Sequence, residues 1–157
     1  MCDFRKLKEV FITNFDIVIT CNSFPHLLTN VDITRALKNI YVIKPNGLFL
    51  ASIKDYNSIL ESKPTIFQPS AYGNGAKHWL SFEEWNWQKR KPIYKLNHFI
   101  IKKQNNGWKT VCRSANLRAI KQSEFTTFLL ATGFKNIKWH LPEDTGFFQP
   151  IVTAIKN

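Results

Sequence analysis

The order of apolar and polar positions predicts alternating strands and helices in the first third of the chain. Phe15–Cys21, with the sequence FDIVITC, is an almost unbroken apolar and β-branched run, typical of a strand buried on both faces of a parallel sheet. A helix is expected next, with Thr29 or Asn30 as its N-cap. Pro45-Asn46-Gly47 is expected to stop that helix, and residues 48–53 to form a second buried strand.

The expected helix has one apolar face, formed at helical spacing by Ile33, Leu37, Ile40 and Tyr41. Lys44 suits the C-terminal end of such a helix, where a cation interacts favourably with the helix dipole. Strand, crossover helix and strand over residues 15–56 therefore predict a βαβ unit with parallel strands and a right-handed connection.

The pattern changes after residue 55. Residues 55–76 contain Pro and Gly at several positions and predict a short helical turn followed by an irregular connection. Residues 78–120 contain three aromatic and β-branched segments separated by turn signals. Asn106-Gly107 predicts a tight hairpin turn, because both central positions of that turn favour positive φ. We therefore expect an antiparallel three-stranded cap over this segment.

The last segment, residues 121–157, predicts a helix and two closing strands. Ser123 is the expected N-cap of the helix and Gly133 its end. The sequences FKNIKWHL and PIVTAI follow and read as the two strands. The chain is therefore predicted to be a single α/β domain over residues 1–157.

Composition narrows the class of protein. The chain has 157 residues, enough for one domain, and no apolar run near the roughly 20 residues needed to cross a bilayer. Its start does not resemble a signal peptide, so we expect a cytoplasmic protein without a membrane partner. The net charge is +11, but Lys is spread along the chain with one short run at residues 89–91, so nucleic acid is not the expected partner. The three Cys and four His are scattered, and no metal site is expected.

The segments FDIVITCNSFPHLL, ALKNIYVIKPNGLFLASIKDYNSIL and TGFFQPIVTAIKN resemble the second half of class I S-adenosylmethionine-dependent methyltransferases. The chain is most similar to small-molecule enzymes such as the glycine and sarcosine N-methyltransferases. The resemblance implies a Rossmann-like sheet with the family's strands 4-5-7-6 and an inserted antiparallel cap. It also implies S-adenosylmethionine as cofactor and a small amine-bearing molecule as substrate.

The resemblance places the site at the carboxyl end of the first strand, where ligands of open α/β sheets bind. It implies that Asn22 faces the substrate and that Ser23, Phe24 and His26 lie beside the adenosyl group. Without the resemblance, Asn22 and Ser23 read as a cap at the exit of the strand, Phe24 as a core residue and His26 as an ordinary loop histidine.

Two further residues are candidates for substrate binding. Lys54 stands where the relatives of the glycine enzyme carry an Arg that binds a substrate carboxylate, although Lys cannot form the same bidentate pair. A solvated lysine at the end of a strand is the alternative. Gln149, in the connection between the last two strands, is expected either to wall the acceptor site or to pack within that connection. No residue is assigned as catalytic.

The donor-binding features of the family are not recognisable in the sequence. No glycine-rich loop stands between a strand and a helix, and only Asp3 and Phe4 match the segment that the family places near the adenine. The chain therefore resembles a methyltransferase that begins after its third strand. Phe15–Cys21 would then be an exposed sheet edge, covered by a companion polypeptide or by a second copy.

The sequence thus predicts the acceptor-side part of a methyltransferase, inactive until a donor-binding half completes its S-adenosylmethionine site. A rival reading is a non-catalytic basic module, derived from the same fold, that binds an acidic partner or nucleic acid. The two differ in the salt dependence of binding, which is steep only for a polyanion partner.

Overall fold

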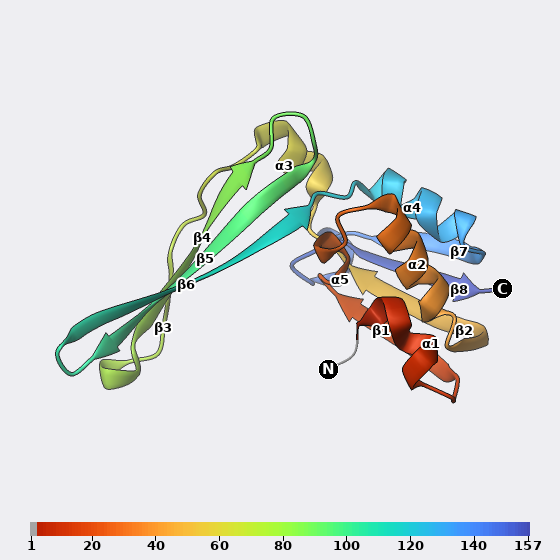
Figure 1. Cartoon of the computed structure of the whole chain (residues 1–157), viewed down its shortest axis with the longest axis horizontal. Coiled ribbons are helices and arrows are strands. Elements are labelled where there is room, and N and C mark those ends of the chain that lie inside the picture. The colour runs from red at the N-terminus through yellow and green to blue at the C-terminus, as the bar shows by residue number, and fades with distance from the viewer. Residues whose placement is uncertain (1–2) are drawn as a thin grey trace. The chain divides into compact units, whose positions relative to one another are not determined.

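The computed structural model describes residues 3–157 and shows an α/β protein, as the sequence predicts (Figure 1). The chain forms two compact units. One comprises the chain up to Ser58 together with Ile120–Asn157, and the other is Ile59–Ala119. The helix α3 (Tyr56–Ser62) leads from the first unit into the second.

The first unit, called here the α/β unit, is built on a four-stranded sheet. Its strands, in spatial order, are β1 (Phe15–Cys21), β2 (Ile43–Ser52), β8 (Ile151–Lys156) and β7 (Phe134–His140). β1 and β2 are parallel, whereas β8 is antiparallel to both of its neighbours. β1 is therefore one edge of the sheet.

Helices α2 (Asn30–Ile40) and α4 (Gln122–Ala131) contact each other, and buried aromatic rings link α4 to one face of the sheet (Figure 1). Phe24 connects α4 to the sheet, because its ring centroid lies 4.7 Å from that of Phe125 on α4 and 6.2 Å from that of Phe49 on β2. Thr29 caps α2 through the backbone N–H of Asp32, as predicted. The predicted cap at Ser123 is wrong. Lys121 occupies the N-cap position and Ser123 lies within the helix.

The prediction that Pro45-Asn46-Gly47 separates helix from strand is wrong in detail. β2 already begins at Ile43, so Lys44 lies in a strand and pairs with Asp16 of β1 at 2.8 Å. The register jumps between Phe15↔Ile43 and Ile17↔Leu48, which leaves the Pro-Asn-Gly segment bulged out of the ladder. Asn46 takes a left-handed φ of 62°, which Asn tolerates better than other residues with a side chain.

β1 is also less buried than its apolar sequence predicts. Ile17 and Ile19 are 53% and 60% exposed, whereas Phe49 and Val152, on the face that carries Phe24, are fully buried. Ile17 pairs with Leu48, and Ile19 with Leu50, so these side chains share the other face of the sheet. Sheets of this kind normally carry helices on both faces. The α/β unit thus presents an open edge and an apolar sheet face beside it.

The second unit, called here the antiparallel unit, has four strands where the sequence predicts three. Their spatial order is β3 (Ser70–Tyr72), β4 (Trp79–Trp87), β5 (Ile93–Gln104) and β6 (Gly107–Arg118). A short helix, η3 (Gly75–Lys77), separates β3 from β4. The core of the unit is a stack of the buried Trp85 and Tyr94 rings, 4.0 Å apart.

The β5–β6 hairpin is present, but its turn differs from the prediction. Gln104 pairs with Gly107, so the two turn residues are Asn105 and Asn106 rather than Asn106 and Gly107. Asn105 and Asn106 have negative φ, whereas Gly107 has a positive φ of 124°. Glycine is therefore needed at the first residue after the turn and not inside it.

Candidate functional site

The candidate site lies at the carboxyl ends of the two parallel strands. The chain leaves β1 through Asn22, whose φ of 48° is in the left-handed region. The backbone N–H of Asn22 donates to the carbonyl of Ser52 at 2.9 Å. A residue with a side chain pays a steric cost in this conformation, which turns the chain sharply at the sheet edge where ligands of α/β folds bind.

Three oxygen atoms at this end of the sheet are buried and have no hydrogen-bond partner: Asn22 Oδ1, Ser52 Oγ and Gln149 Oε1. Thr20 Oγ1, one residue before the end of β1, is a fourth such atom. Ser52 is opposite both Cys21 of β1 and Ile151 of β8, and the N–H of Ile53 donates to the carbonyl of Pro150 at 3.2 Å. The register therefore brings Asn22, Ser52 and Gln149, named here the oxygen cluster, to the same end of three neighbouring strands.

Buried polar atoms are nearly always paired, so unpaired acceptors need an explanation. Each carbonyl oxygen of the cluster can only accept a hydrogen bond, and the Ser52 hydroxyl can both accept and donate. Each of them would be satisfied by an N–H or O–H group that donates to it. No member of the cluster titrates near neutral pH, so the site can orient a donor group without removing a proton from it.

Ser52 is a site residue that the sequence analysis missed. It is the last residue of β2 and is 3% exposed. The signal was present in the sequence, since Ser52 is the hydroxyl residue inside the apolar run LFLASI at the end where ligands bind.

The other residues of the β1 loop have separate roles. Ser23 Oγ donates to the carbonyl of Cys21 at 3.1 Å, which agrees with the alternative reading of Ser23 as a cap at the strand exit. His26 is exposed at the end of the short helix η2 (Phe24–His26). Its side chain is therefore accessible to a ligand.

Phe24 is a core residue of the α/β unit. Its side chain is fully buried and contacts three other rings, those of Phe4, Phe49 and Phe125. The alternative reading of Phe24 as core thus describes this structure. Its ring thus joins the segment after β1 to the sheet and to α4, whereas His26, two residues further on, is exposed.

Asp3 makes hydrogen bonds and an ion pair within the N-terminal segment. It caps the short helix η1 (Phe4–Lys6) through the backbone N–H of Arg5, and it pairs with the Arg5 guanidinium at 2.6 Å. Arg5 also pairs with Asp32 at 2.8 Å. The hydrogen bonds from Arg5 lower the pKa of Asp3 to about 2, so its carboxylate is ionised and already engaged. An adenine amino group would have to share it with Arg5.

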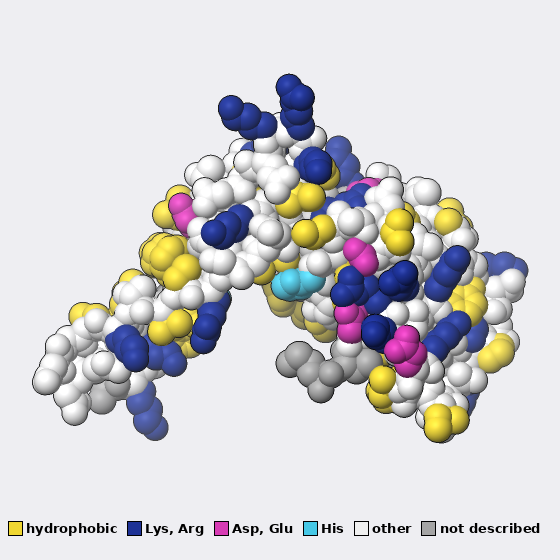
Figure 2. All heavy atoms as spheres, in the orientation of Figure 1, with side chains coloured by type: hydrophobic (Ala, Val, Ile, Leu, Met, Phe, Trp, Pro, Cys, Tyr) yellow, Lys and Arg dark blue, Asp and Glu magenta, His cyan; other side chains and the backbone are white. Residues whose placement is uncertain are grey.

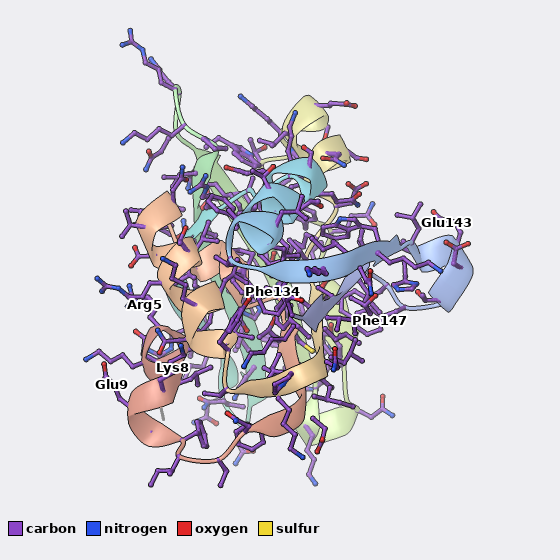
Figure 3. The ribbon with its side chains drawn as sticks, turned by 90° about the vertical axis from the view of Figure 1, so that its right-hand side faces the viewer. Arg5, Lys8, Glu9, Phe134, Glu143 and Phe147 are labelled. Carbon is purple, nitrogen blue, oxygen red and sulfur yellow. The ribbon has the colours of Figure 1, made fainter. Side chains whose placement is uncertain are left out.

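Phe4 and Arg5 belong to a part of the α/β unit well separated from α5 (Pro142–Thr145). Phe4 packs edge-on against Phe24, with ring centroids 5.4 Å apart. In Figure 3 Arg5, Lys8 and Glu9 lie beside α2, and Glu143 lies on α5 at the other side of the unit. The predicted adenine contacts therefore occupy one flank of the unit, next to the N-terminal half of α2.

Lys54 lies two residues beyond the end of β2 and is half-buried. It follows the same strand end as Ser52. Asp55 accepts hydrogen bonds from the Asn57 N–H at 3.1 Å and from Ser58 Oγ at 2.6 Å, which anchors the start of α3. Tyr56 is buried. Lys54 therefore stands between the end of β2 and a helix start that Asp55 anchors.

Two absences apply to the described residues, 3–157. They contain no group of three His, Cys, Asp or Glu side chains that could hold a metal ion. None of their helices combines the length and the apolar character that a membrane crossing requires.

Comparison with known proteins identifies the fold. No protein-family model matches the chain, and no curated protein matches it in sequence. Solved structures match over nearly the whole chain. A S-adenosylmethionine-dependent methyltransferase from Clostridium acetobutylicum has a TM-score of 0.74 at 15% identity, over 98% of this chain and 61% of that one. The chain therefore has the fold of the class I methyltransferases.

Two other similar structures are methyltransferases that act on sugars. CalS10, an amino pentose methyltransferase from Micromonospora echinaspora solved with S-adenosylmethionine bound, has a TM-score of 0.73 at 14% identity, over 99% of this chain and 63% of that one. The sugar N-methyltransferase KedS8 from Streptoalloteichus has a TM-score of 0.75 at 11% identity, over 99% and 61%. The chain spans about three-fifths of the length of each of these structures.

Proposed function

We propose that this chain is the acceptor-side part of a S-adenosylmethionine-dependent methyltransferase that acts on the amine of a small molecule. The observation that carries the proposal is the oxygen cluster at the carboxyl ends of β1 and β2. An amine supplies the N–H donors that these three oxygens lack, and amines are the acceptors of the sugar N-methyltransferase that shares the fold. The finer likeness to the glycine and sarcosine enzymes remains a prediction.

The role of the cluster in such a reaction is to orient the amine. S-adenosylmethionine, when bound, supplies a methyl group already activated by the positive charge of its sulfonium. If a neutral primary amine donates its two N–H groups to two of these oxygens, its lone pair is fixed in direction and can be aligned for in-line attack. No member of the cluster is a base at neutral pH, so the proton that a methylated amine loses would pass to solvent.

The described residues fit the acceptor better than the donor. Only Asp3, Phe4, Ser23 and His26 are candidates to contact the adenosyl group, and Asp3 already pairs with Arg5. No described residues form a glycine-rich turn between a strand and a helix that could receive the methionine end of the donor. We therefore derive no step through the donor from this chain alone.

We propose that a donor-binding segment packs against the open edge of β1. Ile17 and Ile19 are more than half exposed, and the strand next to an exposed apolar face is a natural pairing site. A strand added beside β1 and a helix laid over Ile17 and Ile19 would give the sheet the second covered face that such folds carry. The occupant is a segment of a longer polypeptide or of a companion chain, rather than a second copy, because a copy would bring no glycine-rich turn.

Replacing Asn22 by alanine is expected to weaken amine binding about 10-fold, the loss of roughly one hydrogen bond. Titration of the chain with an amino sugar and with sarcosine, followed by NMR, measures this. Asn136 is a matched control, because it also has a left-handed φ, of 51°, but lies in β7. Asn136→Ala should cost similar stability and leave amine binding unchanged. An equal loss of amine binding in both variants would reduce Asn22 to a structural cap.

Lys54→Ala is expected to act on acceptors that carry a carboxylate. Because Lys54 follows the same strand end as Ser52, its removal should weaken binding of sarcosine about 10-fold and leave an amino sugar without a carboxylate unaffected. The same NMR titration compares the two ligands. Lys38→Ala, on the exposed surface of α2, removes an equal charge and serves as control. Identical affinities for sarcosine in both variants would remove Lys54 from the site.

A further inference from the structure

Most of the positive charge of the chain belongs to the antiparallel unit. Residues 59–119 contain eleven Lys and Arg against three Asp and Glu, which gives this unit +8 of the total +11. The end of the unit formed by residues 70–81 and 100–112 contains four Lys and no acidic residue. On the face shown in Figure 2, this end, at the lower left, shows dark blue side chains and no magenta ones. The charge is thus unbalanced locally and not only on average.

A pocket lies at this basic end. Its volume is about 420 Å³, and it is lined by Lys77, His78, Trp79, Ile100, Lys102 and Lys103. Trp79 and Lys102 are directly opposite each other in the β4–β5 ladder, and the backbone carbonyl of His78 accepts from the N–H of Lys103 at 2.9 Å. The pocket therefore combines the apolar side chains of Trp79 and Ile100 with three lysines, two of them on β5 and one on η3. Its volume is within the range of small-ligand sites.

Two further aromatic rings contact residues of the pocket. Tyr72 stacks on Trp79 with ring centroids 4.2 Å apart, which fixes the orientation of the indole. Trp108, which is 52% exposed, packs edge-on against His78 at 5.6 Å. Large rings left exposed beside lysines are costly for a surface that only has to be soluble, and they offer platforms on which a planar group can stack.

We propose that this pocket binds one nucleotide of a single-stranded nucleic acid, with the base against Trp79 and the phosphates among the lysines. Lys109 is opposite Lys102 in the β5–β6 ladder, so the lysines extend beyond the pocket along the sheet. Four lysines exceed the charge of one nucleotide phosphate, which favours a strand with successive phosphates over a free nucleotide. Stacking on Trp79 requires an unpaired base, which favours a single strand over a duplex.

The test uses the full chain and a fluorescein-labelled ten-residue oligothymidylate, with anisotropy measured over a range of salt concentrations. The double variant Lys102→Ala, Lys103→Ala is expected to lower affinity at least 10-fold. It should also reduce the slope of log K against log salt by roughly 1.4, about 0.7 for each lysine that no longer neutralises a phosphate. Both lysines are exposed, so the fold should tolerate the change.

The control is Lys89→Ala, Lys91→Ala, which removes the same charge from the connection between β4 and β5, outside the pocket. It should change affinity less than 2-fold. An equal effect of both double variants would overturn the site, because it would leave only diffuse attraction between charges.

Competitors test the part played by the rings. Trp79→Leu should weaken binding of the oligonucleotide at least 5-fold and leave heparin, a polyanion without planar bases, unaffected. Equal loss for both ligands would overturn stacking on Trp79. Thymidine monophosphate should compete only weakly. Competition by the free nucleotide at micromolar concentration would overturn the assignment to a strand, and tighter binding of duplex DNA would overturn the preference for unpaired bases.

Discussion

Replacing Phe24 by alanine is expected to lower the free energy of unfolding of the α/β unit by about 3–5 kcal/mol, the usual cost of removing a fully buried phenyl ring. The ring is 0% exposed, and it joins the loop after β1 to the sheet through Phe49 and to α4 through Phe125. The cavity left behind cannot easily close, because each neighbour is held on a different element. Denaturant unfolding, with hydrogen exchange of the β1 and β2 amides to isolate this unit, measures the loss.

Phe148→Ala is the matched control for that measurement. Phe148 is 77% exposed, so the same chemical change should alter stability by no more than about 0.5 kcal/mol. Phe24→Leu should fall between the two variants, since it keeps part of the apolar volume. A loss below about 1 kcal/mol for Phe24→Ala would contradict the role of this ring as the support of the site.

The elements that sequence predicts best are those with a strong local signal. β1 begins and ends as the FDIVITC run predicts, and α2 begins after Thr29 with Ile33, Leu37 and Ile40 buried. In both cases the signal lies within a few residues along the chain, an apolar run for β1 and a cap with an apolar face for α2. The pattern of apolar positions also distinguishes the segments of the α/β unit from the strands of the antiparallel unit.

The details that sequence misses depend on partners distant along the chain. Pro45-Asn46-Gly47 reads as a stop, but Phe15 pairs with Ile43 and draws the preceding residues into β2. A Cβ on Gly47 would lie 2.8 Å from the carbonyl oxygen of Asp16, so this glycine is needed for the approach of β1 rather than for a turn. The hairpin turn is displaced by one residue because the whole β5–β6 register decides it.

The candidate site shows the same division. The position of Asn22 at a strand end could be predicted, since it depends on the strand and on a general rule for α/β sheets. The lack of a hydrogen-bond partner for Asn22 Oδ1 could not be predicted, because it depends on which residues of β2 and of the segment before β8 lie near it. Phe24 and Asp3 show the opposite case. An aromatic ring and a carboxylate are groups that can bind an adenosyl moiety, but in the fold Phe24 packs in the core and Asp3 pairs with Arg5.

S-adenosylmethionine is expected to bind this chain alone with a dissociation constant weaker than about 1 mM. Micromolar affinity requires about 8 kcal/mol, whereas a single hydrogen bond contributes about 0.5–1.5 kcal/mol net and one to a charged group about 1.5–3 kcal/mol. Asp3 is the one carboxylate that the resemblance assigns to the donor, and Arg5 already occupies it. The exposed His26 adds one more contact at most. Calorimetry on the purified chain measures the constant directly, and a micromolar value would contradict the proposal that a donor-binding segment is required.

Supplying that segment should raise the affinity for S-adenosylmethionine at least 1000-fold, to the micromolar range. The part of CalS10 that this chain does not cover can be fused or added for the same calorimetric titration. Ile19→Lys should abolish the gain, because a charge would be buried on the face that the segment covers, while the 60% exposed side chain leaves the stability of the chain itself nearly unchanged. Ile12→Lys, at a fully exposed position outside β1, should preserve the gain. If the gain survives Ile19→Lys as well, the segment must dock elsewhere, and the open edge of β1 has no part in holding the donor.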